Sequence, residues 1–119
     1  MRNGVFHCPV EVAMDVVGGK WTAVVLAHVK EAPRRFSELR RLIPDISEKM
    51  LTQRLRDLEN DELIERTVIS NSPPHVVYDL TAEGRSLGPA LQALYDWGER
   101  RAATADLRIE PAPTPSSTN

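Results

Sequence analysis

The sequence predicts a mainly α-helical domain that carries one small β-hairpin, and two observations support this fold class. Between Arg34 and Asn60, two segments with apolar side chains at helical spacing flank a short turn that contains a proline. Residues 64–69 and 76–80 then have the β-branched pattern of strands, and a turn with paired prolines separates them. Helix, turn, helix and hairpin in this order predict a winged helix-turn-helix.

A first helix is predicted to begin at Pro9, because proline is favoured in the first turn of a helix. Cys8 then lies at or near the N-cap, where exposed N–H groups and the helix dipole favour a thiolate. His7 would support the thiolate if it were protonated, whereas Glu11 opposes it. The alternative is a small apolar side chain at a subunit interface, since free cysteines are commonly buried and inert.

Residues 20–29 predict a second helix that is too apolar to be exposed, so we expect it to lie centrally. Trp21 is expected in the core. His28 lies in an apolar run, and we expect a buried, hydrogen-bonded histidine rather than a metal ligand.

The helix-turn-helix has clear limits in the sequence. Pro44 ends its first helix, because proline lacks an N–H and restricts the residue before it. Ser47 is a favourable N-cap for the second helix. Leu51, Leu55 and Leu58 give that second helix one apolar face.

The opposite face of the second helix carries cations and uncharged hydrogen-bonding groups, with carboxylates on its flanks. Such side chains can read base edges in the major groove of DNA. A solvated face whose acids fell elsewhere by chance is the alternative. We predict base-reading contacts from Lys49, Thr52, Gln53 and Arg56. Contacts to the DNA backbone or from the wing are predicted for Arg34, Arg35, Arg40, Arg41, Ser47, Ser72 and His75. Only some of these arginines are expected to touch DNA, since solvated surface charge is the competing interpretation.

A last helix is predicted to begin after Thr81, with a kink or a new segment at Gly88-Pro89. One small domain cannot easily cover both its long apolar stripe and that of the first helix, so a symmetric dimer is expected. The predicted dimerisation residues are Val10, Met14, Leu87, Leu91, Leu94 and Trp97.

Length and composition indicate a single domain of 119 residues. We expect an N-terminal arm over 1–7, the winged helix-turn-helix with dimerisation helices over 8–103, and a disordered Pro/Ser/Thr tail over 104–119. The absence of an apolar leader and the single cysteine predict a cytoplasmic protein without membrane contact. Neither a catalytic motif nor a zinc-ligand pattern is present, so we predict no enzyme activity, no cofactor and no metal.

The net charge of −2 alone argues against a nucleic-acid partner, but the charge is unevenly distributed. Residues 1–56 carry 10 Lys/Arg against 6 Asp/Glu, whereas 57–119 carry 5 against 11. Basic charge is therefore concentrated in the half that contains the helix-turn-helix, where its local field matters more than the total.

Three segments together resemble the HxlR family of bacterial winged-helix transcriptional regulators. They are CPVEVAMDVVGGKW, RRFSELRRLIPDISEKMLTQRLRDLENDELIER and PPHVVYDLTAEGRSL. The resemblance covers the chain from about Cys8 to about Trp97. It implies a homodimer that binds operator DNA through terminal dimerisation helices, and in some members an N-terminal cysteine that senses oxidants or electrophiles.

The prediction is therefore a homodimeric regulator, a repressor rather than an activator, that binds double-stranded operator DNA with two-fold symmetry. Oxidation or an electrophile at Cys8 would release it. Two alternatives stay open at this point. A non-covalent small ligand could be the trigger, or the winged helix could dock proteins without binding DNA, in which case exposed apolar anchors are expected on the second helix.

Overall fold

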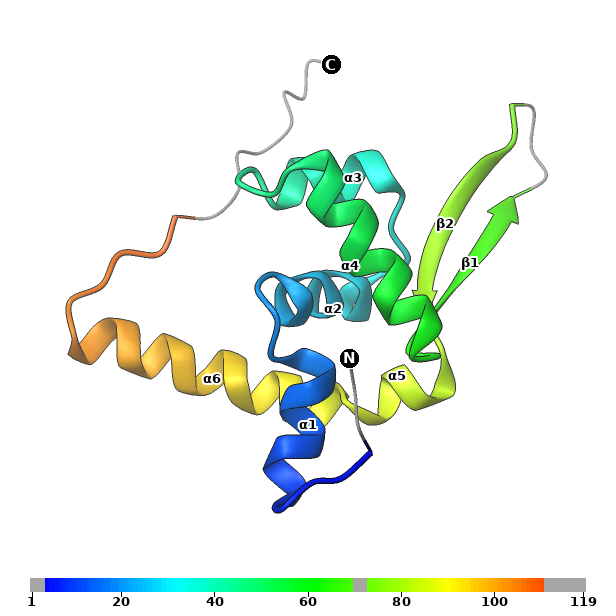
Figure 1. The fold of residues 1–119 in the computed structure, drawn as a ribbon. Coiled ribbons are helices and arrows are strands. Elements are labelled where there is room, and N and C mark those ends of the chain that lie inside the picture. The colour runs from blue at the N-terminus through cyan, green and yellow to red at the C-terminus, as the bar shows by residue number, and fades with distance from the viewer. Residues whose placement is uncertain (1–3, 70–72, 111–119) are drawn as a thin grey trace.

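The computed structural model describes residues 4–69 and 73–110 and confirms the predicted fold class. Figure 1 shows α2 in the centre, α3 and α4 on one side of it, α1, α5 and α6 on the other, and a projecting hairpin. In chain order the elements are α1 (Pro9–Val17), α2 (Thr22–Glu31), α3 (Phe36–Leu42), α4 (Glu48–Asn60), β1 (Ile64–Ile69), β2 (His75–Leu80), α5 (Ala82–Ser86) and α6 (Gly88–Thr104).

The hydrophobic core lies where α2, α3 and α4 meet the base of the hairpin. Leu26 of α2, Leu39 of α3, and Leu51 and Leu55 of α4 are almost fully buried. Because α2 contacts each of α1, α3, α4, α6 and β2, its predicted central position is confirmed.

The start of α2 differs from the prediction. The helix begins at Thr22 instead of residue 20, because Trp21 has a left-handed backbone with φ of 77° and occupies the N-cap position. The Trp21 side chain is half-buried at the edge of the core, so the prediction that it lies in the core is only partly correct. The ammonium group of Lys20 lies 5.1 Å from the centre of its ring.

The limits of the helix-turn-helix follow from local chemistry. α3 ends at Leu42, before Pro44, and the Ser47 hydroxyl accepts a hydrogen bond of 3.0 Å from the Met50 N–H at the start of α4. α4 ends in a left-handed turn at Glu62, whose φ is 63°. The Leu63 N–H then bonds to the Leu58 carbonyl at 3.0 Å, which closes the last turn and directs the chain into β1.

The hairpin pairs β1 and β2 antiparallel, with Ile64 opposite Leu80 at its base and Ile69 opposite His75 at its outer end. β1 has the predicted bounds, and β2 begins one residue earlier than predicted. An isolated β-bridge extends this two-stranded sheet by one residue. Arg34 exchanges backbone hydrogen bonds of 2.9 and 2.8 Å with Tyr78, which anchors the start of the helix-turn-helix against β2.

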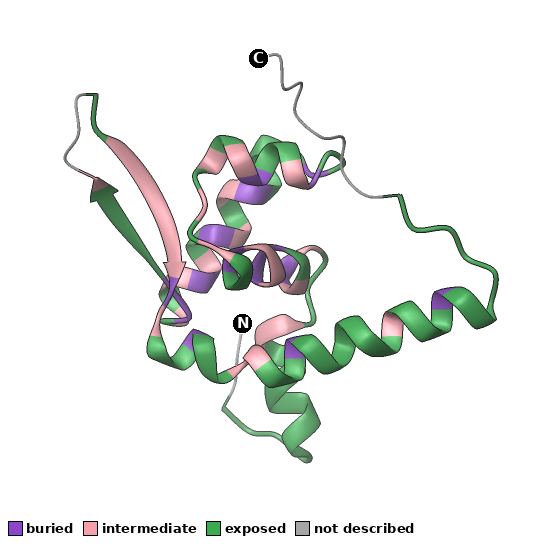
Figure 2. Ribbon diagram, turned by 180° about the vertical axis from the view of Figure 1, so that it is seen from behind, coloured by how far each residue is buried: buried purple, intermediate pink, exposed green. Residues whose placement is uncertain are grey.

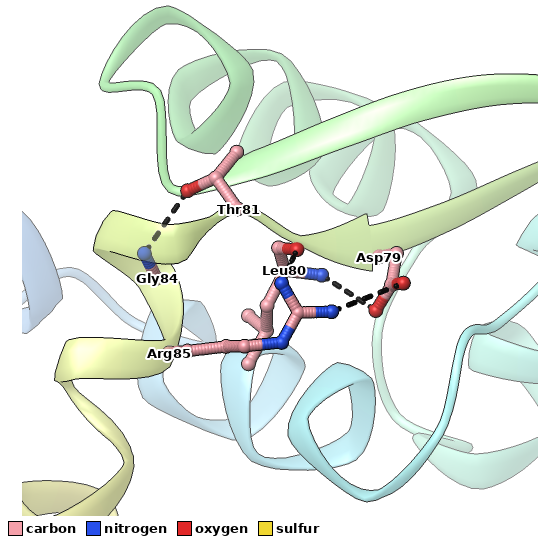
Figure 3. Close-up of polar contacts among 5 residues, drawn as sticks. All are labelled: Asp79, Leu80, Thr81, Gly84 and Arg85. Atoms are coloured by element: carbon pink, nitrogen blue, oxygen red, sulfur yellow. Dashed lines mark hydrogen bonds and ion pairs between the residues drawn. The ribbon is translucent and has the colours of Figure 1, made fainter.

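Hydrogen bonds join the end of the hairpin to α5 (Figure 3). The Thr81 hydroxyl accepts from the Gly84 N–H at 3.0 Å, as an N-cap of α5. Arg85 reaches back from α5 and donates to the Leu80 carbonyl at 2.7 Å, while its second amino group lies 3.4 Å from a carboxylate oxygen of Asp79. The direction of the chain after the hairpin is therefore held by polar contacts as well as by packing.

α5 and α6 are separated at Leu87, which confirms the predicted break beside Gly88-Pro89. α6 includes Thr104, the first residue of the predicted tail, and 105–110 form neither helix nor strand beyond a turn. The remaining tail, 111–119, lies outside the described residues, as does most of the predicted arm, 1–3. In Figure 2 burial is concentrated in the central helices, whereas α1 and most of α6 are exposed.

Within the described ranges, no single helix is long and apolar enough to cross a membrane. Only α1 and α2 taken together reach the necessary length and composition, and they meet at a bend of 78°.

Candidate nucleic-acid interface

The outer face of α4 is an exposed surface of cationic and amide side chains. Lys49, Gln53, Arg56 and Asn60 are exposed, and Thr52 is half-buried beside them. The leucines of the opposite face are buried in the core and orient the helix. Three of the four predicted base-reading residues are thus exposed, and the fourth is half-buried.

One of the flanking carboxylates, that of Asp57, contacts this face. The Gln53 amide nitrogen donates to Asp57 Oδ1 at 2.9 Å. Arg54 in turn forms an ion pair with the other carboxylate oxygen at 3.2 Å. Sequence reasoning missed both Arg54 and Asp57, although the i, i+4 spacing of Gln53 and Asp57 was the signal that could have indicated the contact.

Arg34, a predicted candidate for a phosphate contact, is partly buried by contacts within the chain. Its Nε donates to the His28 carbonyl at 2.9 Å, and Nη2 lies 3.0 Å from Glu31 Oε1. Only 20% of its side chain is exposed. These contacts tie the loop before α3 to the end of α2.

The other predicted arginines remain on the surface. Arg35 precedes α3, where its backbone N–H donates to Glu38 at 2.7 Å while its side chain stays exposed. Arg40 lies 4.0 Å from Glu48, at the limit of an ion pair, and Arg41 is exposed. Arg40 and Arg41 lie in the last turn of α3, before the turn that leads into α4, whereas Arg35 lies at the start of α3.

The predicted contacts at the turn and the wing are placed in different ways. The hydroxyl oxygen of Ser47 caps α4, but the residue is exposed. His75 begins β2 at the outer end of the hairpin and is half-buried. Ser72 lies outside the described residues.

Cys8 is exposed at the N-cap of α1 in the single chain, where it could meet a reagent or a partner subunit. The Glu11 carboxylate accepts hydrogen bonds from the backbone N–H groups of His7 and Cys8, the latter at 3.1 Å. The first turn of α1 is therefore capped by Glu11.

The predicted dimerisation residues fall into two groups. Val10, Met14, Leu94 and Trp97 are 63%, 49%, 55% and 57% exposed. Leu91 is only 6% exposed and belongs to the core of its own chain, so the prediction that it faces a partner is wrong. Leu87 is partly buried against the same core. The break at Leu87 explains the difference, because it turns the beginning of α6 onto α2 and leaves the rest projecting.

A cavity of ≈ 450 Å³ lies behind α4, between its C-terminal half, α1 and α2. Its lining includes Val16, Thr22, Arg54, Asp57 and Leu58. Within residues 4–69 and 73–110 no group of three or more His, Cys, Asp or Glu side chains could hold a metal ion.

The hairpin, the helix-turn-helix and the cationic amide-bearing face of α4 define a winged helix-turn-helix protein. The sequence pattern of the HxlR-like helix-turn-helix family matches residues 16–106. The chain belongs to this family, whose members are DNA-binding transcriptional regulators.

Individual relatives agree with the family assignment. The uncharacterised HTH-type transcriptional regulator YdeP of Bacillus subtilis (strain 168) is 46% identical over 93 residues, which are 78% of this chain and 73% of the relative. The redox regulator HypR in its reduced form is 40% identical, with a TM-score of 0.77 over 85% of this chain and 100% of that chain. Quinone-bound YodB from B. subtilis is 34% identical, with a TM-score of 0.65 over 78% and 99%.

Proposed function

We propose that this regulator represses transcription as a homodimer that places α4 of each subunit in the major groove of a two-fold symmetric operator. The observation that carries the proposal is the composition of the α4 surface. Lys49, Gln53 and Arg56 are exposed together, whereas the leucines of the same helix are buried. Guanidinium and amide groups recognise guanine and adenine in the major groove.

The same surface argues against a protein-docking module. Docking helices present aromatic or aliphatic anchors at the centre of the contact. On α4 the exposed large apolar side chain is Met50, at 37% exposure. The strongly exposed aromatic side chains, Tyr95 and Trp97, lie on α6 instead.

Positioning on the DNA would come from the neighbouring surface. Arg40, Arg41 and Ser47 lie at the turn between α3 and α4, and Arg35 lies at the start of α3; their side chains are suited to phosphate oxygens. His75 and Ser72 of the wing would add contacts beside the groove. Such contacts fix register and orientation and carry no base preference.

Homodimer formation would cover the exposed apolar side chains of the terminal helices, among them Val10, Met14, Leu94 and Trp97. Two recognition helices about 34–36 Å apart would then read two half-sites. Repression is favoured over activation because a small DNA-binding domain can act most simply by excluding the polymerase.

Cys8 is the proposed trigger, and its exposure at the start of α1 makes it accessible to reagents. Because the chain has one cysteine, its oxidation chemistry is restricted. A disulfide between two Cys8 residues needs Cα atoms within about 7 Å across the dimer axis. Addition of the sulfur to a quinone needs no second cysteine, since the S–C bond forms and the thiol proton passes to the adduct. We favour such an adduct, or a mixed disulfide formed by exchange with a small disulfide that releases one thiol.

The DNA-binding proposal is tested by selecting binding sites from a random DNA library with the full chain, followed by affinity measurements on variants. We expect a two-fold symmetric motif. Gln53→Ala or Arg56→Ala should weaken binding to that motif by about 1–3 kcal/mol and relax one position in each half-site. Arg41→Ala should weaken all sequences alike and reduce the salt dependence. The matched control is Arg34→Ala, since a structural arginine should change stability rather than the salt dependence of binding.

The trigger is tested by following operator release during titration with a quinone. We expect Cys8→Ser to bind the operator and to ignore the reagent. A response equal to that of the parent protein would remove Cys8 from the mechanism. The cavity behind α4 then favours the second candidate, a non-covalent ligand, which would be sought by the rise in melting temperature across a panel of small metabolites.

A further inference from the structure

The amide of Gln53 is held by a neighbour on the same helix. Asp57 lies one turn further along α4, and its Oδ1 accepts from Gln53 Nε2 at 2.9 Å. A carboxylate has only acceptors, so the end of the amide that faces Asp57 must be the NH₂ group. The orientation of the amide is therefore assigned by chemistry. Within the described residues, Gln53 Oε1 has no hydrogen-bond partner and remains available on the exposed surface.

Asp57 is itself fixed by Arg54. The Nη2 atom of Arg54 lies 3.2 Å from Asp57 Oδ2, and only 22% of the arginine side chain is exposed. The guanidinium packs over the turn between α1 and α2, where a Cβ added to Gly19 would come within 3.0 Å of Nη1. A partly buried arginine thus holds the carboxylate in place and balances its charge. This balance matters because an uncompensated carboxylate beside the reading face would repel DNA phosphates.

We propose that Asp57 is a positioning residue that sets the base preference of Gln53 to adenine. This inference rests on the proposed binding of α4 in the major groove. With one Nε2 hydrogen on Asp57, Oε1 can accept from adenine N6 and the second Nε2 hydrogen can donate to N7. Without Asp57 the amide is free to rotate by 180°, and it could then present its donor to guanine or thymine acceptors. The carboxylate converts an adaptable side chain into a selective one.

The simpler explanation is that these contacts only stabilise the helix. Side-chain pairs at i, i+3 and i, i+4 commonly contribute to helix stability and have no effect on binding preference. The two explanations differ in one observable, the base preferred at a single position of each half-site. Stability cannot alter that preference when every variant is folded.

The experiment repeats the library selection with the full-length parent, Gln53→Ala, Asp57→Ala and Asp57→Asn. Glu59→Ala is the control, because it removes a carboxylate from the same helix and has no side-chain contact with Gln53 among the described residues. Circular dichroism verifies that each variant is folded. Affinities are then measured for duplexes that carry A·T, G·C, T·A or C·G at the position that depends on Gln53.

We expect the parent and Glu59→Ala to prefer A·T at that position by about tenfold or more. Gln53→Ala should lose the preference, and Asp57→Ala should reduce it to about threefold or less. Asp57→Asn should reduce it as well, because the single asparagine oxygen would face the Arg54 guanidinium and its NH₂ group would then turn towards Gln53.

Two results would overturn the inference while leaving the proposed function intact. They are a Gln53-dependent position that is not adenine, and an Asp57→Ala protein that keeps the adenine preference. A parent protein that selects no motif at all would instead overturn the proposed function, and the inference with it.

Discussion

α4 and α6 are both amphipathic helices, but they treat their apolar faces differently. In α4 the three leucines at 51, 55 and 58 are buried, and apart from Met50 the side chains exposed to solvent are polar. In α6, which is longer, only Leu91 and Ala102 are buried, whereas Leu94, Tyr95 and Trp97 are more than half exposed. α4 completes the core of its own chain. α6 has an apolar surface that the protomer does not cover.

The difference separates the residues that fold the protomer from those available for assembly. α1 resembles α6 in this respect, because none of its residues is buried. A contiguous apolar surface on a regulator is a typical site of association. We therefore expect substitutions in the core, where α2, α3 and α4 meet the base of the hairpin, to change the free energy of unfolding. Substitutions on the outer parts of α1 and α6 should change association instead.

The most direct test of this difference is to place a charge at either of two positions on α6, in two separate variants. Leu91→Asp puts a carboxylate into the core, where an uncompensated charge costs on the order of 3–5 kcal/mol. We expect the variant to unfold at low urea concentration. Leu94→Asp, at a side chain that is 55% exposed, should leave the protomer folded.

Light scattering separates the two outcomes. Leu94→Asp should shift the mass from dimer to monomer and abolish tight operator binding, since two half-sites need two recognition helices. A folded Leu94→Asp dimer would show that the exposed part of α6 does not form the interface. Leu94→Ala serves as the control for loss of the side chain without added charge.

Two glycines give a second matched pair. A Cβ on Gly84 would come within 2.1 Å of the Leu63 carbonyl oxygen, which accepts the Thr81 N–H at 3.0 Å. Gly84→Ala should therefore lower the free energy of unfolding by about 3 kcal/mol, as overpacking against backbone does. Gly98, in the middle of α6, has no atom within 4 Å of its added Cβ.

Gly98→Ala is expected to stabilise α6 by about 0.5–1 kcal/mol, because alanine restricts the unfolded chain more than glycine does. Urea unfolding of both variants at two protein concentrations measures the difference. Equal losses of stability at Gly84 and Gly98 would contradict this expectation, since they would mean that α6 is packed as closely as α5.

The cap of α4 tests how far the recognition helix depends on its own terminus. Ser47→Ala removes the acceptor for the Met50 N–H, and caps of this kind contribute about 1 kcal/mol. We expect a loss of that size in urea unfolding and little change in dimer mass. Ser47→Asp restores an acceptor and should recover the stability, so a variant that stays destabilised would assign the effect to something other than the cap.

Much of the helix-turn-helix and the hairpin could be predicted from the sequence, because the residues that define their limits are local. Pro44, the Ser47 cap and the leucine spacing define α3 and α4, and β-branched residues define β1 with its observed bounds. The start of α2 could not be predicted, because the left-handed backbone at Trp21 is unusual for a bulky residue and depends on the surrounding packing.

The site was predictable in composition but not in its contacts. Exposure of Lys49, Gln53 and Arg56 follows from helical periodicity. The structural role of Arg34 depends on the His28 carbonyl and on its pairing with Tyr78, 44 positions further along the chain, and no local pattern indicates such a contact. Leu91 and Leu94 share one stripe in the sequence, and only the direction of α6 beyond the break at Leu87 decides which of them is buried.

The smallest expected effect concerns His28, on the helix that contacts both α4 and α6. Partial burial lowers the pKa of His28 below its ordinary value of about 6.5; the nearby Glu31 carboxylate opposes this shift, and the positive charge of Arg34 adds to it. The folded state therefore favours the neutral ring, so its contribution to stability is complete above about pH 6.5 and is lost as the pH falls through the lowered pKa. We expect the free energy of unfolding to decline as the pH falls below about 6.5. His28→Gln should flatten that decline when urea unfolding is measured across the same range. An unchanged slope in the variant would assign the acid sensitivity to other groups, and an equal loss of dimer mass would place it in the terminal helices rather than in the core.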